Sequence, residues 1–144
     1  MKIQFMYHGN PRGQERPRFG GRAYKTAEAK AYENAIAIAY KIAVRNRKPL
    51  EEPLGVNILA GYPIPASASR AQRAAMVSGE PLPTKKPDID NVVKAILDAL
   101  NGEAWMDDKQ VVSVTAKKIY AEHPGLIVTI CTGEDLQAMK GASI

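Results

Sequence analysis

A chain of 144 residues is long enough for one domain with a hydrophobic core, and this one carries a formal net charge of +5. No apolar run approaches the length of a membrane-spanning helix, and residues 1–10 lack the apolar core and cleavage site of a signal peptide. The single cysteine, Cys131, excludes a disulfide framework and a thiolate metal cluster, so we expect a reducing, cytoplasmic setting with no membrane partner.

The charge is distributed unevenly along the chain. Residues 1–48 carry eleven Lys or Arg against three Asp or Glu, whereas residues 87–144 carry five against nine. A basic first part and an acidic last part indicate that one binds a polyanion and the other a cation. A solvated surface with uneven charge is the simpler alternative, and charge alone does not decide between the two.

The first third of the chain predicts a strand, a loop and a long helix. Residues 2–9 alternate loosely between apolar and polar side chains, which is typical of a strand. Residues 10–25 are rich in Arg, Pro and Gly and show no regular period, so they predict a loop. Thr26 is expected to cap a helix that runs to about residue 47, before Pro49. Steps of three and four residues predict its buried face: Tyr32, Ala35, Ile36, Ala39 and Ala43.

A second strand and a long connection follow. Residues 54–64 predict the strand, and residues 65–87 form a polar connection of a length that is usually functional or mobile in a compact domain. The middle of this connection could form a short helix capped by Ser67 or Ser69.

The last part predicts a helix and two strands, over residues 90–101, 110–121 and 126–132. The order β-α-β-α-β-β predicts an α+β (mixed α/β) fold, a single domain over residues 1–144. We expect a mixed sheet of about four strands packed against two main helices. Strands separated by helices favour parallel pairing, and the last two strands are expected to form an antiparallel hairpin.

Carboxylates gather around the second long helix, in the stretch "PDIDNVVKAILDALNG" and the following "WMDDKQ". In an extended segment, Asp88 and Asp90 would point the same way while Ile89 points into the core. After the helix the chain turns back, so Asp107 and Asp108 could return near the helix start. Oxygen ligands without His or Cys suit Mg²⁺ or Mn²⁺.

Each feature of this stretch also has an ordinary explanation. Aspartate is a favoured helix cap, so Asp88 or Asp90 alone needs no catalytic role. Lys94 lies one turn after Asp90 on the polar face and could form a helix ion pair worth a few tenths of a kcal/mol. Two aspartates before a strand are common in turns. The combination of a basic segment, an acidic cluster and an intervening lysine favours a metal site.

These residues resemble the RusA family of Holliday junction resolvases, especially its phage-type members. The resemblance depends on the pattern D-x-D-N-x-x-K, then D-A-L on a helix, then an aromatic residue before D-D-x-Q-V. The segments "RPRFGGRAYKT" and "TKKPDIDN" are also similar to that family, and the resemblance covers most of residues 1–131. A lone D-x-D would be weak, but the whole combination in this order and spacing is specific.

The resemblance implies a small homodimeric endonuclease of bacterial or phage-infected cells that cuts four-way DNA junctions by paired nicks. It implies Mg²⁺ as the cofactor, with Mn²⁺ able to substitute. Carried over by position, Asp88, Asp90 and Asp108 match the family's metal-binding acids, and Asp107 matches the neighbouring acid. Lys94 matches the catalytic lysine.

Basic residues outside this motif are candidates for DNA contacts. Arg16, Arg18 and Arg22 are expected to contact phosphates, and Phe19 or Tyr24 could stack on a base or wedge between bases. Lys85 and Lys86 directly precede the acids and could grip the strand that is cut. The residues expected to be structural or merely exposed are His8, Trp105, His123 and Cys131.

The sequence is also compatible with two other classes of function. A non-catalytic DNA-binding module would use the basic segment but would not need four carboxylates. A metal-dependent nucleotide phosphatase would use the carboxylates but would not need the basic segment or the long connection.

Overall fold

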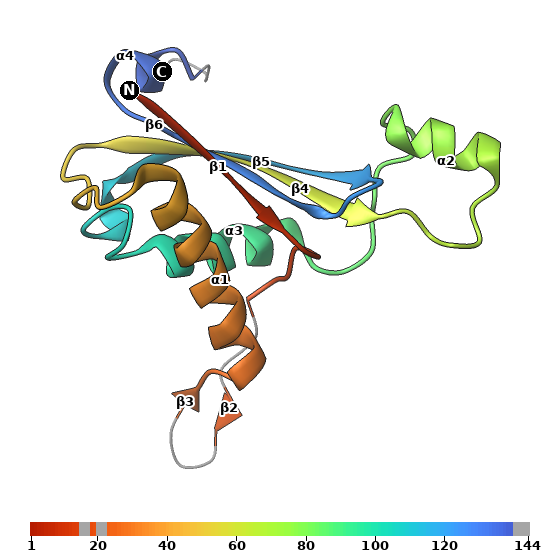
Figure 1. Cartoon of the computed structure of the whole chain (residues 1–144), viewed down its shortest axis with the longest axis horizontal. Helices are drawn as coiled ribbons and strands as arrows, with labels where there is room; N and C mark the ends of the chain where they lie inside the picture. The colour runs from red at the N-terminus through yellow and green to blue at the C-terminus, as the bar shows by residue number, and fades with distance from the viewer. Residues whose placement is uncertain (15–17, 20–22, 140–144) are drawn as a thin grey trace.

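A four-stranded mixed sheet, covered by helices on one face, forms the centre of the fold (Figure 1). The computed structural model describes residues 1–14, 18, 19 and 23–139. The sheet order is β1-β6-β4-β5, with β4 and β5 parallel and the other neighbours antiparallel. The strands of the sheet are β1 Lys2–His8, β4 Leu54–Pro63, β5 Val111–Ala121 and β6 Gly125–Cys131.

Helices α1 and α3 pack on the same face of the sheet, while α2 projects away from it beyond the end of β4 (Figure 1). The helices are α1 Ala27–Val44, α2 Arg70–Val77, α3 Ile89–Leu100, the 3₁₀ turn η1 Asp108–Gln110 and α4 Gly133–Gln137. The expected α+β domain is therefore confirmed, with order β-α-β-α-α-β-β in its main elements. Within the described residues, no helix has the length and apolar character needed to cross a membrane.

Local signals in the sequence account for the starts of α1 and α2. Thr26 Oγ1 accepts the backbone N–H of Ala29 at 3.2 Å and caps α1. The short helix in the long connection is present, and Ser69 caps it through a reciprocal pair of hydrogen bonds with Gln72. Both caps agree with the residues that the sequence singles out.

The core lies between the sheet and the two long helices. Its fully buried side chains include Ile36 and Tyr40 of α1, Ile96 of α3, and Val56 and Ile58 of β4. Alternation along β4 points Val56, Ile58 and Ala60 at the helices, as expected from period-two patterning.

Two expected features of the helices are wrong in detail. α1 ends at Val44 instead of near residue 47, and Ala43 is exposed whereas Tyr40 is buried. Steps of three and four from Ile36 allow either residue, and burial of Tyr40 removes much more apolar surface from water. Ile89 is 43% exposed instead of pointing into the core, because α3 begins there and helical periodicity replaces strand alternation.

Two expected features of the strands are also wrong. Residues 10–25 include a small antiparallel pair, β2 Arg18–Phe19 with β3 Ala23–Tyr24. The last two strands do not form a hairpin, because β4 lies between β5 and β6. The connection between them crosses beside Gly61, where an added Cβ would lie only 3.0 Å from Ala121 Cβ. The missing side chain leaves room for this crossing.

The core position Ile36 provides a test of this packing. We expect Ile36→Ala to lower the free energy of unfolding by about 2–5 kcal/mol, because a fully buried side chain is removed and a cavity remains. The matched control is Ile38→Ala on the same helix, where the side chain is 55% exposed and the loss should stay within about 0.5 kcal/mol. Urea unfolding measures both, and equal losses would contradict the assignment of the buried face.

Candidate active site

Asp88 and Asp90 lie at the N-terminus of α3. Asp88 occupies the N-cap position with extended backbone angles (φ −66°, ψ 148°), and Asp90 lies in the first helical turn. Both side chains are exposed. The positive end of the helix dipole and the free N–H groups of the first turn favour negative charge at this position.

The carboxylate of Asp88 does not cap the helix. A capping aspartate accepts a hydrogen bond from an N–H of the first turn, as Thr26 and Ser69 do in α1 and α2. Asp88 makes no such bond, and among the described residues its carboxylate has no hydrogen-bond or ion-pair partner. Asp90 Oδ1 accepts the adjacent N–H of Asn91 at 3.0 Å. The explanation of Asp88 as an ordinary cap therefore does not account for its side chain.

The segment before Asp88 is held from the side of β5. Lys118 Nζ donates to the carbonyl oxygens of Lys85, at 2.6 Å, and Pro87, at 2.8 Å. Hydrogen bonds from a charged donor are among the stronger ones in proteins. The ammonium group of Lys118 therefore helps to fix the chain where it enters α3.

The N-terminal segment also holds the start of α3. The N–H of Gln14 donates to the carbonyl oxygen of Asn91 at 2.9 Å. Gly13 packs so closely that an added Cβ would lie 2.7 Å from Pro87 Cβ and 3.1 Å from Asn91 Cβ. The segment that leads into the basic β2–β3 pair is thus attached beside Asp88 and Asp90.

Lys94 lies one turn after Asp90 on the outer side of α3. Its side chain is 64% exposed, and its Nζ atom is 3.7 Å from Asp98 Oδ2. Asp98 also accepts a short hydrogen bond from Gln14 Nε2 and lies 3.7 Å from Lys25 Nζ. Because Asp98 has these other partners, it does not depend on Lys94 for neutralisation.

The protonation of Lys25 supports its role as a second cationic partner of Asp98. Burial alone would lower the pKa of Lys25, but its hydrogen bond to Glu33, at 2.6 Å, and the charges of Glu33 and Asp98 outweigh that effect and raise the pKa above its ordinary value. Lys25 therefore stays protonated beside both carboxylates, so Asp98 has a second cation close to it besides Lys94.

Asp107 and Asp108 lie beyond the other end of α3, and both have structural partners. Asp107 caps η1 by accepting the N–H of Lys109 at 2.9 Å. Asp108 Oδ1 accepts the indole N–H of Trp105 at 2.8 Å. Trp105 is fully buried, as expected for a core residue, so Asp108 is attached directly to the core.

One chain does not bring the two pairs of aspartates together. They lie at opposite ends of α3, whose twelve residues span about 18 Å (Figure 1). Within the part of the chain that the structure describes, no group of three or more His, Cys, Asp or Glu is close enough to share a metal ion. Asp88 and Asp90 alone still fit Mg²⁺, which is often held by one or two carboxylates, water and a substrate phosphate.

The basic residues expected to contact DNA are only partly described. Arg16 and Arg22 lie outside the described residues, and Arg18 is placed through the backbone of β2. Lys85 and Lys86 are exposed just before Asp88. Sequence reasoning missed Lys118 and the close approach of Gly13, because neither has a signature within its own segment.

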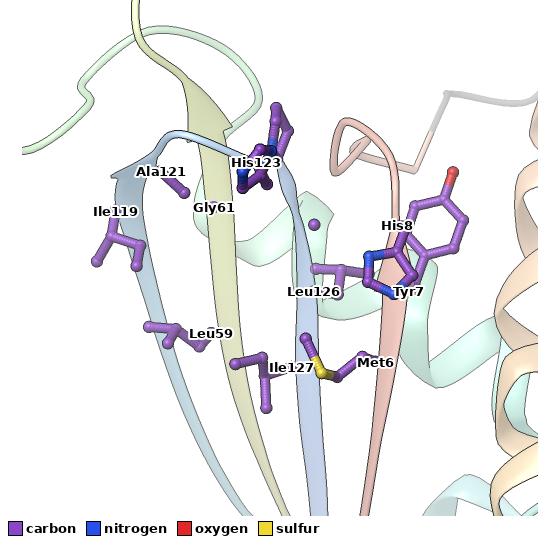
Figure 2. A pocket seen from close by; sticks show the side chains of 12 residues that line it. Met6, Tyr7, His8, Leu59, Gly61, Ile119, Ala121, His123, Leu126 and Ile127 are labelled. Carbon is purple, nitrogen blue, oxygen red and sulfur yellow. The ribbon is translucent and has the colours of Figure 1, made fainter. Parts of the chain in front are cut away.

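Another hollow lies away from this site, on the face of the sheet that α1 and α3 leave open (Figure 2). It has a volume of about 590 Å³, and Met6, Leu59, Ile119 and Ile127 present apolar side chains across the strands. His8 and His123 lie at its end and are exposed. No carboxylate lines this hollow, so it lacks the chemistry of the site at α3.

Comparisons with known proteins show which family the chain matches. The family model described as endodeoxyribonuclease RusA matches residues 8–131. The chain is also 33% identical over 137 residues to a protein of Bacillus subtilis (strain 168) named uncharacterized protein YqaN. That match covers 89% of this chain and 94% of the relative.

Lys118 allows the support of the α3 start to be tested without an activity assay. We expect Lys118→Met to increase amide hydrogen exchange in residues 84–91 severalfold, because two charge-assisted hydrogen bonds to this segment are lost. Lys117→Met is the matched control, since Lys117 is the exposed neighbour on the other face of β5. Exchange measured by mass spectrometry should be unchanged in the control, and unchanged exchange in both variants would contradict this role of Lys118.

Proposed function

This chain belongs to the RusA endodeoxyribonuclease family, and we propose that it cuts four-way and other branched DNA by paired, Mg²⁺-dependent nicks. The observation that carries this proposal is the pair of exposed carboxylates at the start of α3, one of which occupies a cap position without capping the helix. A carboxylate at a helix N-terminus that has no partner among the described residues is suited to a ligand that supplies positive charge.

Asp88 and Asp90 are the proposed ligands of the metal ion on this chain. When bound, Mg²⁺ would activate water and stabilise negative charge on the phosphate that is cut. The carboxylates orient this centre, and the hydrogen bonds of Lys118 and Gln14 keep the chain around them in place. Lys94, on the same side of α3, is proposed to stabilise charge that develops on the phosphate.

Two groups of basic residues are proposed to hold the DNA. Lys85 and Lys86 precede Asp88 and are exposed, so they can contact the backbone of the strand that is cut. Arg16, Arg18 and Arg22 belong to the segment that starts beside α3 and are proposed as further phosphate contacts.

A second copy of the chain is the proposed partner. α3 carries a stripe of partly exposed apolar side chains at four-residue steps: Ile89, Val93 and Leu97. This stripe lies on the opposite flank of α3 from Asp98, which contacts residues of the α1 side. Val112 and Val114, on the neighbouring edge strand β5, are 63% and 42% exposed. An apolar flank beside an open strand edge is typical of a surface that another chain covers.

A two-fold arrangement about this flank would complete the acidic site. With the two-fold axis perpendicular to α3, two copies of α3 and β5 would run antiparallel, so that the end of α3 in one copy lies beside the start of α3 in the other. Asp107 and Asp108 of one copy would approach Asp88 and Asp90 of its partner, and the same contact would recur at the second site. Two sites related by a two-fold axis suit a four-way junction, which is itself nearly two-fold symmetric.

The proposed function is tested by Asp90→Asn. We expect this change to lower the nicking rate at least about 100-fold while junction affinity stays near that of the unmodified protein, because it removes a ligand charge and keeps the shape. The control is Asp135→Asn, since Asp135 pairs with the N-terminal ammonium group at 3.0 Å, away from α3. Gel assays on branched and linear DNA, with Mg²⁺ or EDTA, measure cutting and binding separately.

The same assays separate the other two functions. A non-catalytic DNA-binding module would bind the junction and cut nothing under any condition. A nucleotide phosphatase would hydrolyse mononucleotides and show no affinity for branched DNA. Normal nicking by the Asp90→Asn protein would overturn the assignment of the metal ligands.

Sites shared between two copies predict an unusual complementation. Asp90→Asn and Asp108→Asn proteins should each be inactive, yet their mixture should recover nicking at roughly a quarter of the unmodified rate. In a mixed dimer both defects fall in one site, which leaves the other site intact. Asparagine at position 108 can still accept the indole N–H of Trp105, so the fold is retained. No recovery after unfolding and refolding the mixture would mean that each site lies within one chain.

A further inference from the structure

A smaller cavity, of about 180 Å³, lies at the carboxyl ends of β4 and β5. Tyr62 and Tyr120 are register neighbours near the ends of these two parallel strands, and both line the cavity. The remaining apolar wall is made of three prolines: Pro63, Pro65 and Pro83. The carboxyl ends of parallel strands are a frequent place for ligands in sheets that carry helices.

Positive charge surrounds this aromatic surface. Lys85 and Lys86 line the cavity together with the tyrosines. Lys118 Nζ lies 5.6 Å from the centre of the Tyr62 ring and also binds the carbonyl oxygens of Lys85 and Pro87. The side chain of Lys118 thus contacts both the Tyr62 ring and the backbone of the segment that carries Lys85 and Lys86.

We infer that this cavity binds one unpaired nucleobase of the DNA strand that is cut. Aromatic faces with adjacent cations are the recurring means of holding single-stranded nucleic acid, because any base can stack and the lysines bind the flanking phosphates. The volume is below the range of about 300–1,000 Å³ that is usual for drug-sized ligands, which favours a single base over a larger group.

The cavity adjoins the proposed metal site. Lys86 is two residues before Asp88, so their Cα atoms are at most about 7.6 Å apart. A base held here would therefore belong to a nucleotide next to the phosphate that is cut. This inference rests on the proposed function and adds to it a means of selecting the substrate.

Base pairing determines what can enter. In an intact duplex the base must first be unpaired and unstacked, which costs a few kcal/mol, whereas at a branch point that cost is smaller. The cavity would therefore favour branched over linear DNA, and its shape would favour some bases over others near the cut.

The experiment combines a protein variant with a modified junction. The cut is first mapped with the unmodified protein, and an abasic nucleotide is then placed on either side of it. Binding is measured in Ca²⁺, so that turnover does not interfere. We expect the abasic nucleotide at one of the two positions to weaken binding by about 5- to 150-fold, the range for loss of one stacked base.

Tyr120→Leu removes the aromatic face but keeps apolar volume. This variant should bind the intact junction more weakly by a similar factor, and the abasic nucleotide should then cause no further loss. Tyr120→Phe keeps the ring and should behave like the unmodified protein. Urea unfolding of each variant checks that the fold is retained.

The outcomes separate this inference from the proposed function. If the unmodified protein binds and cuts the junction but the effects of Tyr120→Leu and the abasic nucleotide are additive, the cavity does not hold the base. Equal affinity for intact and abasic junctions at both positions would also overturn it. Failure to bind or cut branched DNA at all would instead overturn the proposed function, and this inference with it.

Discussion

The parallel pairing of β4 with β5 is the constraint on which the rest of the arrangement depends. Parallel neighbours start at the same end of a sheet, so the chain that leaves β4 after Pro63 must travel back along the sheet before β5 begins at Val111. α3 makes this return with its apolar side packed against the strands. The residues before α3 and those after it therefore lie at opposite ends of the sheet, and the two pairs of aspartates are separated for this reason.

The two pairs also differ in how firmly the fold holds them. Asp108 is bonded to the buried indole of Trp105, so its position is coupled to the core. Asp88 and Asp90 are exposed on a helix start that Lys118 and Gln14 support through backbone atoms. The chain therefore positions both carboxylates while leaving them exposed to solvent, which is useful where the substrate contributes part of the site.

The sequence predicted what depends on neighbouring residues and missed what depends on distant ones. The caps at Thr26 and Ser69, the alternation of β4 and the parallel pairing across a helix are confirmed, because each follows from local chemistry or from a general rule of connection. The predicted hairpin of the last two strands is wrong, because β4 lies between them, and this strand order depends on the packing of the whole sheet. The motif located the four aspartates, but their separation depends on the direction of β5, which the motif does not contain. Lys118 was missed because its partners are more than thirty residues away in sequence.

Because the two pairs of aspartates are separated within one chain, a two-fold dimer could bring four carboxylates together at each site. If α3 and β5 of two copies run antiparallel, the distance that separates the aspartates in one chain becomes the distance between two equivalent sites, each built from both copies. The exposed Val112, Val114 and Ile89 would be covered by the same contact, which removes apolar surface from water as it assembles the ligands. A single chain would then hold incomplete sites, and two phosphates on opposed strands would be cut only after dimerisation. The cavity lined by Tyr62 and Tyr120 lies at the Asp88 end of each copy. Each of the two sites would therefore have its own subsite for an unpaired base.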